Sequence, residues 1–428
     1  MFYDVRKFRG EGLFSPTIID LVFLVHSWLQ SFKRINGSIN SQVSALIEGL
    51  FNGISIGSVL LIAALGLAIV FGLMGVINLA HGELMMLGAY TTFVVQNVFK
   101  LFGEPWFDFY IVVAIPIAFL IAAVAGMILE RGAIRFLYGR PLETLLATWG
   151  VSLILQQLVR SVNWLLVICL GVLCLLFFGG ITTLGRRENW EIIRVRAIAF
   201  LLPIAIAIAI AMGFLLNKIT ALTKPWFSAR NVDVTAPAWL RGGVEVLGFQ
   251  MPYVRLFIIA LTIICLIGVY WFLHRSAWGL RIRAVTQNRT MSSCLGIPTA
   301  KVDALTFALG SGLAGIAGCA VSLLGSVGPN TGQNYIIDTF MVVVVGGVGN
   351  LLGTVVAAMS IGIFNYLIGS GTLALFLTSI DASKPLIDFF LFFATSSMAK
   401  VMVFALIITF LQIKPAGLFP QKGRTAEL

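Results

Sequence analysis

Long runs of apolar residues, separated by short polar segments, recur along most of the chain. Each run approaches the roughly 20 helical residues that cross a hydrocarbon core of about 30 Å. In lipid, only helices and closed barrels satisfy their backbone hydrogen bonds, and the sequence lacks the ten-residue alternation typical of barrel strands. The pattern therefore predicts an all-α, polytopic transmembrane helical bundle. Its predicted spans, about 10–12 in number, cover residues 13–32, 47–73, 83–102, 107–129, 143–162, 165–181, 197–216, 253–273, 303–325, 334–347, 350–376 and 386–412.

Composition supports a membrane protein. Of the 428 residues, 59% are hydrophobic and only 11% are charged, whereas soluble proteins carry about 25% charged residues. The first apolar run, residues 13–32, fits a membrane span less well than the others, because it includes Pro16, Asp20 and His26. This segment either crosses the membrane or lies along its interface.

The basic residues predict which loops face the cytoplasm. Cytoplasmic loops are enriched in Lys and Arg, which accounts for the net charge of +11 without a nucleic-acid partner. Loops 130–141 and 274–302 and the tail after residue 413 are basic, so we place them inside. The segments "FGEPWFD" and "GSVGPNTGQN" lack basic residues and are predicted to lie outside.

The spans group into four regions. Two apolar runs with a basic turn form a hairpin that leaves the orientation of everything downstream unchanged, so it is predicted to be a removable insertion. The regions are an N-terminal extension over 1–46, a first half of the core over 47–163, the inserted hairpin over 164–219, and a second half of the core over 220–428.

Glycines recur at helical spacing. Gly49, Gly53 and Gly57 share one ridge of their predicted span, where small residues let neighbouring helices approach closely. Near Gly75, Gly82 and 346–349, the glycines instead predict breaks in helices, which can expose backbone groups to a polar cavity.

The stretch "NLAHGE" places Asn78, His81 and Glu83 between apolar runs. On a continuous helix, Glu83 would lie opposite the other two. If the helix breaks nearby, Glu83 instead enters the first turn of the next helix, where a carboxylate is favoured. Two interpretations stay open: a capped turn that packs helices, or a direct role in gating or solute passage, since ionisable residues at membrane depth often serve function.

A polar stripe runs along the predicted span 143–162. Thr148, Ser152, Gln156 and Arg160 are spaced by four residues. Such a stripe either lines an aqueous path or links helices by hydrogen bonds. Together with Asn78, His81 and Glu83, we take Thr148, Ser152 and Gln156 as candidates for the translocation path of a small hydrogen-bonding solute.

Loop 274–302 is long, basic and partly amphipathic. Apolar residues punctuate its arginines, which is typical of a short helix that docks into a groove of another protein. The residues assigned to this docking segment are Arg281, Arg283, Gln287, Asn288, Arg289, Leu295 and Gly296.

The sequence offers no sign of an enzyme. With three histidines in the chain and no second cluster of ligands, we predict no metal site and no catalytic site. There is no phosphate-binding loop of the form G-x-x-x-x-G-K-[ST], so no cofactor is predicted in this chain, and any ATP would be used by a separate polypeptide.

Four motifs carry a family resemblance. They are "GVINLAHGELMMLGAY", "AVTQNRTMSSCLGIP" with "ALTFALGSGLAGIAG", "GGVGNLLGT" and "KPAGLF". In this order they resemble the branched-chain amino acid class of ABC-transporter permeases. "GRPLETLLATWGVSLILQQ" and "NVDVTAP" look most like the branch that imports urea. The resemblance covers residues 47–163 and 220–420.

The resemblance implies a multi-pass subunit of the bacterial inner membrane. Its expected partners are a sister permease, two cytoplasmic ATPases and an extracytoplasmic substrate-binding protein, and it assigns ATPase contact to the loop around 287–298. "TMSSCLGI" departs from the Glu-Ala-Ala pattern of well-known coupling loops, and the hairpin lies outside the usual pattern.

The predicted function is therefore ATP-driven import of urea or a related small polar nitrogen compound. Branched-chain amino acids and short-chain amides are the alternative solutes. A stand-alone channel or an ion-coupled carrier is the alternative of a different class.

Overall fold

The computed structural model describes residues 16–104, 106–184, 190–224, 226–227, 231–246, 249–379 and 383–419. Arg186 and Arg187 of the predicted hairpin turn, and Lys422 and Arg424 of the basic tail, lie outside the described residues. The elements are α1 (Pro16–Met74), α2 (His81–Phe102), η2 (Trp106–Phe109), α3 (Tyr110–Gly132), η3 (Ile134–Leu137), α4 (Pro141–Ser161), α5 (Trp164–Leu184), α6 (Trp190–Leu216), α7 (Thr220–Thr223), η4 (Ala238–Leu240), β1 (Gly243–Val246), β2 (Phe249–Pro252), α8 (Tyr253–Arg275), α9 (Ala277–Gln287), α10 (Arg289–Cys294), α11 (Thr299–Leu324), α12 (Thr331–Gly346), α13 (Leu351–Gly369), α14 (Thr372–Ser379), α15 (Lys384–Phe392) and α16 (Ser396–Ile413).

The described residues form an all-α membrane fold apart from the short strand pair β1–β2. Seven of their helices are long and apolar enough to cross a membrane, and two shorter apolar stretches lie in α5 and α6. The predicted spans 13–32 and 47–73 fall in the single helix α1, which contains no proline after Pro16. The prediction that the first half of α1 either crosses the membrane or lies along its interface stays a prediction.

Two predicted spans are each interrupted. The span predicted over 350–376 consists of α13 and α14, because Gly371 has a φ of 71° that an α-helix does not accommodate. The span predicted over 386–412 consists of α15 and α16. The Thr395 hydroxyl, directly before α16, accepts a hydrogen bond of 3.4 Å from the backbone N–H of Met398. Thr395 thus caps the N-terminus of α16.

The chain divides into two compact units. One comprises residues 1–53, 243–251 and 363–404, and the other comprises 54–242, 252–362 and 405–428. Within the first unit, the side-chain amide of Asn52 donates a hydrogen bond of 2.8 Å to the hydroxyl of Tyr366. Gly53 lies so close to Ile363 that a Cβ at the glycine would stand 2.6 Å from the Ile363 Cα. The predicted glycine ridge thus marks a close approach of helices.

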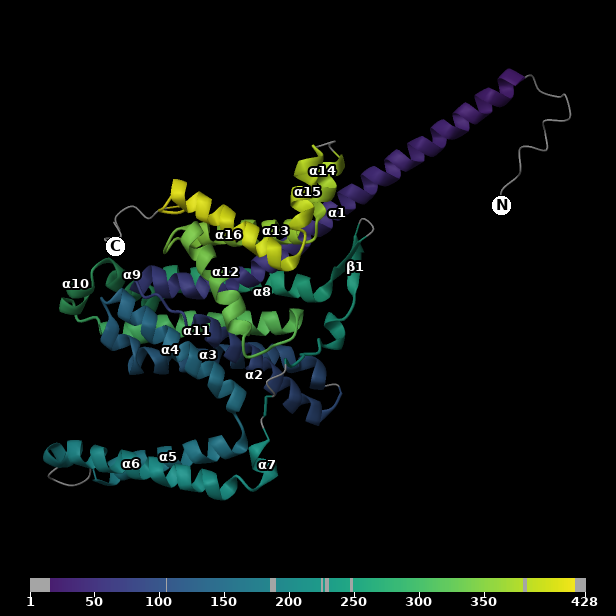
Figure 1. The fold of residues 1–428 in the computed structure, drawn as a ribbon. Helices are drawn as coiled ribbons and strands as arrows, with labels where there is room; N and C mark the ends of the chain where they lie inside the picture. The colour runs from purple at the N-terminus through teal and green to yellow at the C-terminus, as the bar shows by residue number, and fades with distance from the viewer. Residues whose placement is uncertain are drawn as a thin grey trace. The chain divides into compact units, whose positions relative to one another are not determined.

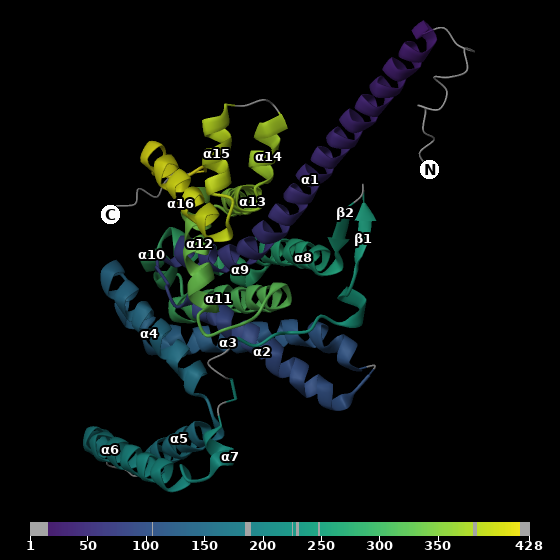
Figure 2. The same ribbon diagram turned by 45° about the vertical axis from the view of Figure 1, so that its right-hand side comes forward.

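The core of the second unit is the contact of α11 with α2 and α3, which lie beside it in both views (Figures 1 and 2). Small residues make this contact possible. A methyl group on Gly88 of α2 would overlap the backbone of Gly315 in α11, and one on Gly315 would overlap the carbonyl oxygen of Ala118 in α3. Helices in lipid gain stability from such close packing, because the bilayer supplies no hydrophobic drive between them.

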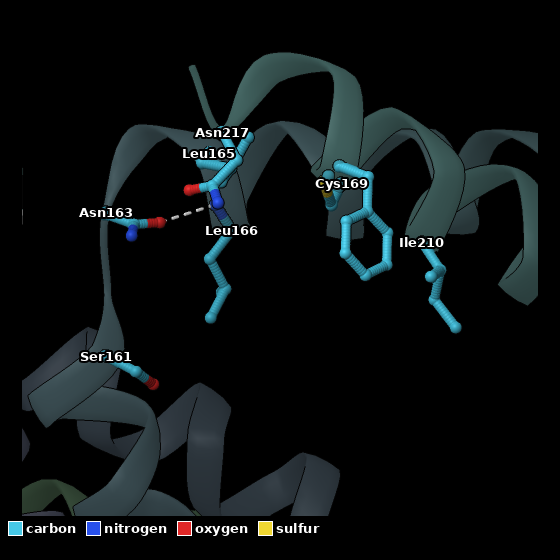
Figure 3. Close-up of a pocket in the computed structure, with 9 residues that line it drawn as sticks. Ser161, Asn163, Leu165, Leu166, Cys169, Ile210 and Asn217 are labelled. Atoms are coloured by element: carbon cyan, nitrogen blue, oxygen red, sulfur yellow. Dashed lines mark hydrogen bonds between the residues drawn. The ribbon is translucent and has the colours of Figure 1, made fainter. Parts of the chain in front are cut away.

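The inserted hairpin is the pair of helices α5 and α6, which pack side by side (Figure 1). A mostly apolar cavity of about 430 Å³ lies at its base, with Asn163, Cys169 and Ile210 among its lining residues (Figure 3). The Asn163 carboxamide oxygen accepts a 2.7 Å hydrogen bond from the backbone N–H of Leu166 and so caps α5. The two ends of the hairpin lie close together, because the Asn163 side chain donates a 3.4 Å hydrogen bond to the carbonyl of Thr223.

Candidate functional site

The "NLAHGE" stretch joins two helices. Helix α1 ends at Met74, Gly75 takes a positive φ of 68°, and α2 begins at His81. The side-chain oxygen of Asn78 accepts a 3.1 Å hydrogen bond from the N–H of Ala80, which closes the turn before α2. The predicted break therefore occurs at Gly75 and not at Gly82, because Gly82 lies inside α2 and packs against the backbone of Gly332.

His81 and Glu83 stand in the first turn of α2 and are each 1% exposed. Nε2 of His81 lies 3.0 Å from the carbonyl oxygen of Ala63. Because a carbonyl oxygen only accepts, Nε2 is the protonated nitrogen. Among the described residues, Nδ1 of His81 and Nδ2 of Asn78 have no hydrogen-bond partner.

Glu83 meets the polar stripe of α4. One carboxylate oxygen accepts hydrogen bonds from the Gln156 amide at 2.7 Å and from the Ser152 hydroxyl at 3.1 Å. The other carboxylate oxygen is buried without a partner among the described residues. The structure thus brings Glu83, Ser152 and Gln156 together, whereas His81 contacts α1.

Thr148 completes the contact one turn earlier along α4. Its hydroxyl accepts a 3.2 Å hydrogen bond from the backbone N–H of Leu79. Thr148, Ser152 and Gln156 are all at most 5% exposed. In this conformation the stripe therefore links α4 to the turn before α2 and to its first residues, and a role of these residues in solute passage stays a prediction.

The docking segment of loop 274–302 forms two short helices, α9 and α10. Each is capped by a side chain: Ser276 accepts from the N–H of Gly279 at 2.9 Å, and Asn288 accepts from the N–H of Met291 at 2.9 Å. Gly296 follows α10 with a φ of 78°. The sequence pattern predicted one short helix, and the polar cap at Asn288 explains why there are two.

The apolar residues of this segment divide into two sets. Ile282 and Val285 are buried, whereas Leu280, Met291 and Leu295 are 63%, 59% and 76% exposed. Arg283 and Gln287 line a cavity of about 280 Å³ beside the ends of α1 and α8. The exposed leucines and methionine give the segment the apolar face that a docking helix needs.

Charges hold α10 in place. Arg289 donates a 2.6 Å hydrogen bond to Asp303 of α11, and its guanidinium lies 4.9 Å from the centre of the Tyr138 ring. The Tyr138 hydroxyl donates to the buried Glu130 at 3.2 Å. Burial raises the pKa of the Tyr138 phenol, and the Asp303 and Glu130 carboxylates raise it further, so Tyr138 stays a donor at neutral pH. Arg281 instead lies over Trp278, with 4.8 Å between its guanidinium carbon and the ring centre.

Sequence reasoning missed Asp303, Glu130 and Tyr138 as partners of the docking segment. A carboxylate so near the start of an apolar span was a usable signal, because such a charge needs a partner. Among the described residues, no three His, Cys, Asp or Glu side chains lie close enough to hold a metal ion.

Comparisons with known proteins agree with this architecture. The family described as "Branched-chain amino acid transport system / permease component" matches residues 49–411. The high-affinity branched-chain amino acid transport system permease protein LivH of Escherichia coli K12 is 24% identical over 382 residues, which cover 89% of this chain and 97% of that protein. The permease BraD of Pseudomonas aeruginosa is 25% identical over 319 residues, 74% of this chain and 84% of BraD.

A relative also occurs in an archaeon. The probable branched-chain amino acid transport permease protein LivH of Methanocaldococcus jannaschii is 24% identical over 325 residues, which cover 76% of this chain and 80% of that protein. No solved structure matches the chain.

Proposed function

Because the chain belongs to the family of branched-chain amino acid transport permeases, we propose that it is the membrane-spanning subunit of an ATP-driven importer of branched-chain amino acids. Members of this family are transport subunits and not enzymes, and this chain is a multi-pass membrane protein. We place it in the bacterial inner membrane. The names of the relatives support amino acids as the solute.

The observation that carries the proposal is the exposed apolar face of α9 and α10. A self-contained channel has no need of a basic, amphipathic segment that leaves Leu280, Met291 and Leu295 uncovered by the described residues. An ATPase that docks on this segment would transmit to the permease the conformational change between its own ATP-bound and ATP-free states. The permease would then shift between conformations open to either side.

The proposed partners are those expected of an importer of this family. Two cytoplasmic ATPases would dock on the segments of this chain and of a sister permease, and an extracytoplasmic binding protein would deliver the solute. ATP would bind to the partner subunits.

Urea is the second candidate solute. It is favoured by the motifs "GRPLETLLATWGVSLILQQ" and "NVDVTAP", and the neutral Ser152 and Gln156 side chains suit a solute that only forms hydrogen bonds.

The two solutes are distinguished by measuring the uptake of radiolabelled leucine and of radiolabelled urea. Uptake is compared between a strain in which this gene is deleted and the same strain with the gene restored. Leucine uptake that requires the gene, and that excess unlabelled urea leaves unchanged, supports the proposal. Gene-dependent urea uptake without leucine uptake would replace it with the second candidate.

A further inference from the structure

A polar cavity of about 350 Å³ lies where the end of α4 meets the loop before α12. Its polar lining includes Arg160, Asn231, Ser326, Asn330, Thr331 and Asn334. Both segments are predicted to face the outside of the cell. None of the described residues that line the cavity is acidic.

The walls of this cavity are built from well-packed backbone. Val232 and Val327 exchange two backbone hydrogen bonds of 2.7 and 2.8 Å. Val327 also shares a buried cluster with Val159, the neighbour of Arg160, and with Tyr90 of α2. The Asn231 amide donates to the Ser326 hydroxyl at 3.2 Å. The cavity is therefore held open by contacts from α2, α4 and two loops.

The guanidinium of Arg160 gives the cavity positive charge, and the buried Glu83 carboxylate lies within electrostatic range of it. Arg160 donates one hydrogen bond of 2.6 Å to the side-chain oxygen of Asn330, and a guanidinium offers five N–H donors. Neither of the two ion pairs found among the described residues involves Arg160. The first turn of α12 begins at Thr331 on the same wall, and a helix N-terminus adds positive potential.

A second polar group lies nearby with its bonding capacity unused. Tyr90 is 3% exposed, and its hydroxyl has no hydrogen-bond partner among the described residues. The hydroxyl lies within electrostatic range of the Arg160 guanidinium. Gln156, one turn before Arg160 on α4, is already bound to Glu83.

We propose that this cavity binds the carboxylate of an amino-acid solute, with Arg160 as its charge partner. Guanidinium and carboxylate form charge-assisted hydrogen bonds that are stronger than neutral ones, whereas neutral urea has no negative charge to pair with the guanidinium. The inference rests on the proposed function and deepens it, because it names the part of the solute that the permease recognises.

The test is equilibrium binding of radiolabelled leucine to the full-length chain in lipid nanodiscs. Isovalerate, which has a carboxylate and a branched aliphatic chain one carbon shorter than that of leucine, should compete with leucine, and urea should not. Arg160→Gln should weaken leucine binding about tenfold or more, and Arg160→Lys should weaken it less. The matched control is Arg241→Gln, because Arg241 is exposed and donates to the carbonyl of Ala236 outside the cavity.

The possible results distinguish a failure of the cavity proposal from a failure of the proposed function. Wild-type binding by Arg160→Gln, competition by urea as strong as that by isovalerate, or no leucine binding by the wild-type chain would overturn the cavity proposal. Leucine binding that depends on Arg160 without leucine uptake by cells would overturn the proposed function alone. If Arg160→Gln does not fold, Arg160→Lys and the two competitors still decide, since both competitors are tested on the wild-type chain.

Discussion

The carboxylate of Glu83 accepts a hydrogen bond of 2.7 Å from the side chain of Gln156, a residue 73 positions later in the chain. This bond joins the start of α2 to the C-terminal part of α4, and both partners are buried. The two motifs that stand out most in the sequence, "NLAHGE" and the polar stripe of span 143–162, therefore meet at one place.

The bond between Glu83 and Gln156 should stabilise the fold. Gln156→Leu removes the shorter of the two hydrogen bonds to a buried carboxylate, which costs about 1–3 kcal/mol, so the melting temperature of the purified chain should fall. Gln157→Leu is the matched control, because Gln157 is exposed on the same helix. An unchanged melting temperature combined with reduced uptake would instead assign Gln156 to the solute path.

The contact of Gly82 with Gly332 should tolerate no side chain. In Gly82→Ala the added methyl group would overlap the carbonyl oxygen of Gly332, so α2 and α12 must separate. We expect a lower yield of folded protein in detergent, measured by size-exclusion chromatography. Gly268→Ala in α8 is the control, since a Cβ there meets open space and alanine favours the helix. Equal yields from both variants would contradict the packing.

The ion pair between Arg289 and Asp303 should hold the docking segment to α11. Arg289→Gln leaves the 5% exposed Asp303 side chain without its cation. The expected loss is about 1–2 kcal/mol, less than for a fully buried pair because Arg289 is half exposed. Thermal unfolding measures the loss, and Asp303→Asn in the same chain should recover part of it. Arg281→Gln, which breaks no ion pair among the described residues, is the control; no recovery in the double variant would argue against the pair.

The exposed apolar face of α9 and α10 should bind the ATPases. Leu295 is 76% exposed, so Leu295→Asp should leave the fold intact and reduce the amount of ATPase that co-purifies with the chain by about tenfold or more. Leu142→Asp adds the same charge at an 83% exposed leucine on the same predicted side and should have no effect. Full retention of the ATPases by Leu295→Asp would refute the docking role.

The α5–α6 hairpin should be removable. Its ends are joined by hydrogen bonds, one of which runs from the N–H of Trp226 to the carbonyl of Val162 at 3.0 Å, so a short Gly-Ser linker can replace residues 164–219. The shortened chain should insert in the membrane and co-purify with the ATPases at the level of the full chain. Loss of the ATPases from a chain that still inserts would show that the hairpin contributes to assembly.

Much of the helix content could be predicted from hydropathy, since apolar runs of sufficient length must be helical in lipid. The contacts also agree with the predicted grouping of the loops at two ends of the bundle, whereas which end faces the cytoplasm stays a prediction. Tyr138 and Arg289, which come from two loops predicted inside, touch each other, and Asp108 accepts a 2.8 Å hydrogen bond from the N–H of Ala238, both on the predicted outer side.

The partners of the polar residues could not be predicted. Periodicity shows which residues share a face of a helix, but it does not show which helix that face meets. The sequence therefore left open whether Gln156 contacts solvent or Glu83, and it could not indicate that Arg160 meets the loop at Asn330, 170 positions later. The break at Gly371 was missed because the apolar run continues across it.

The most direct test reconstitutes the purified chain into proteoliposomes with its sister permease, both ATPases and the binding protein, and follows radiolabelled leucine. The account predicts that leucine accumulates only when the ATPases are present and supplied with ATP, and that vesicles with this chain alone stay impermeable to it. Solute flux through this chain alone, without ATP, would identify a channel or an ion-coupled carrier and contradict the account.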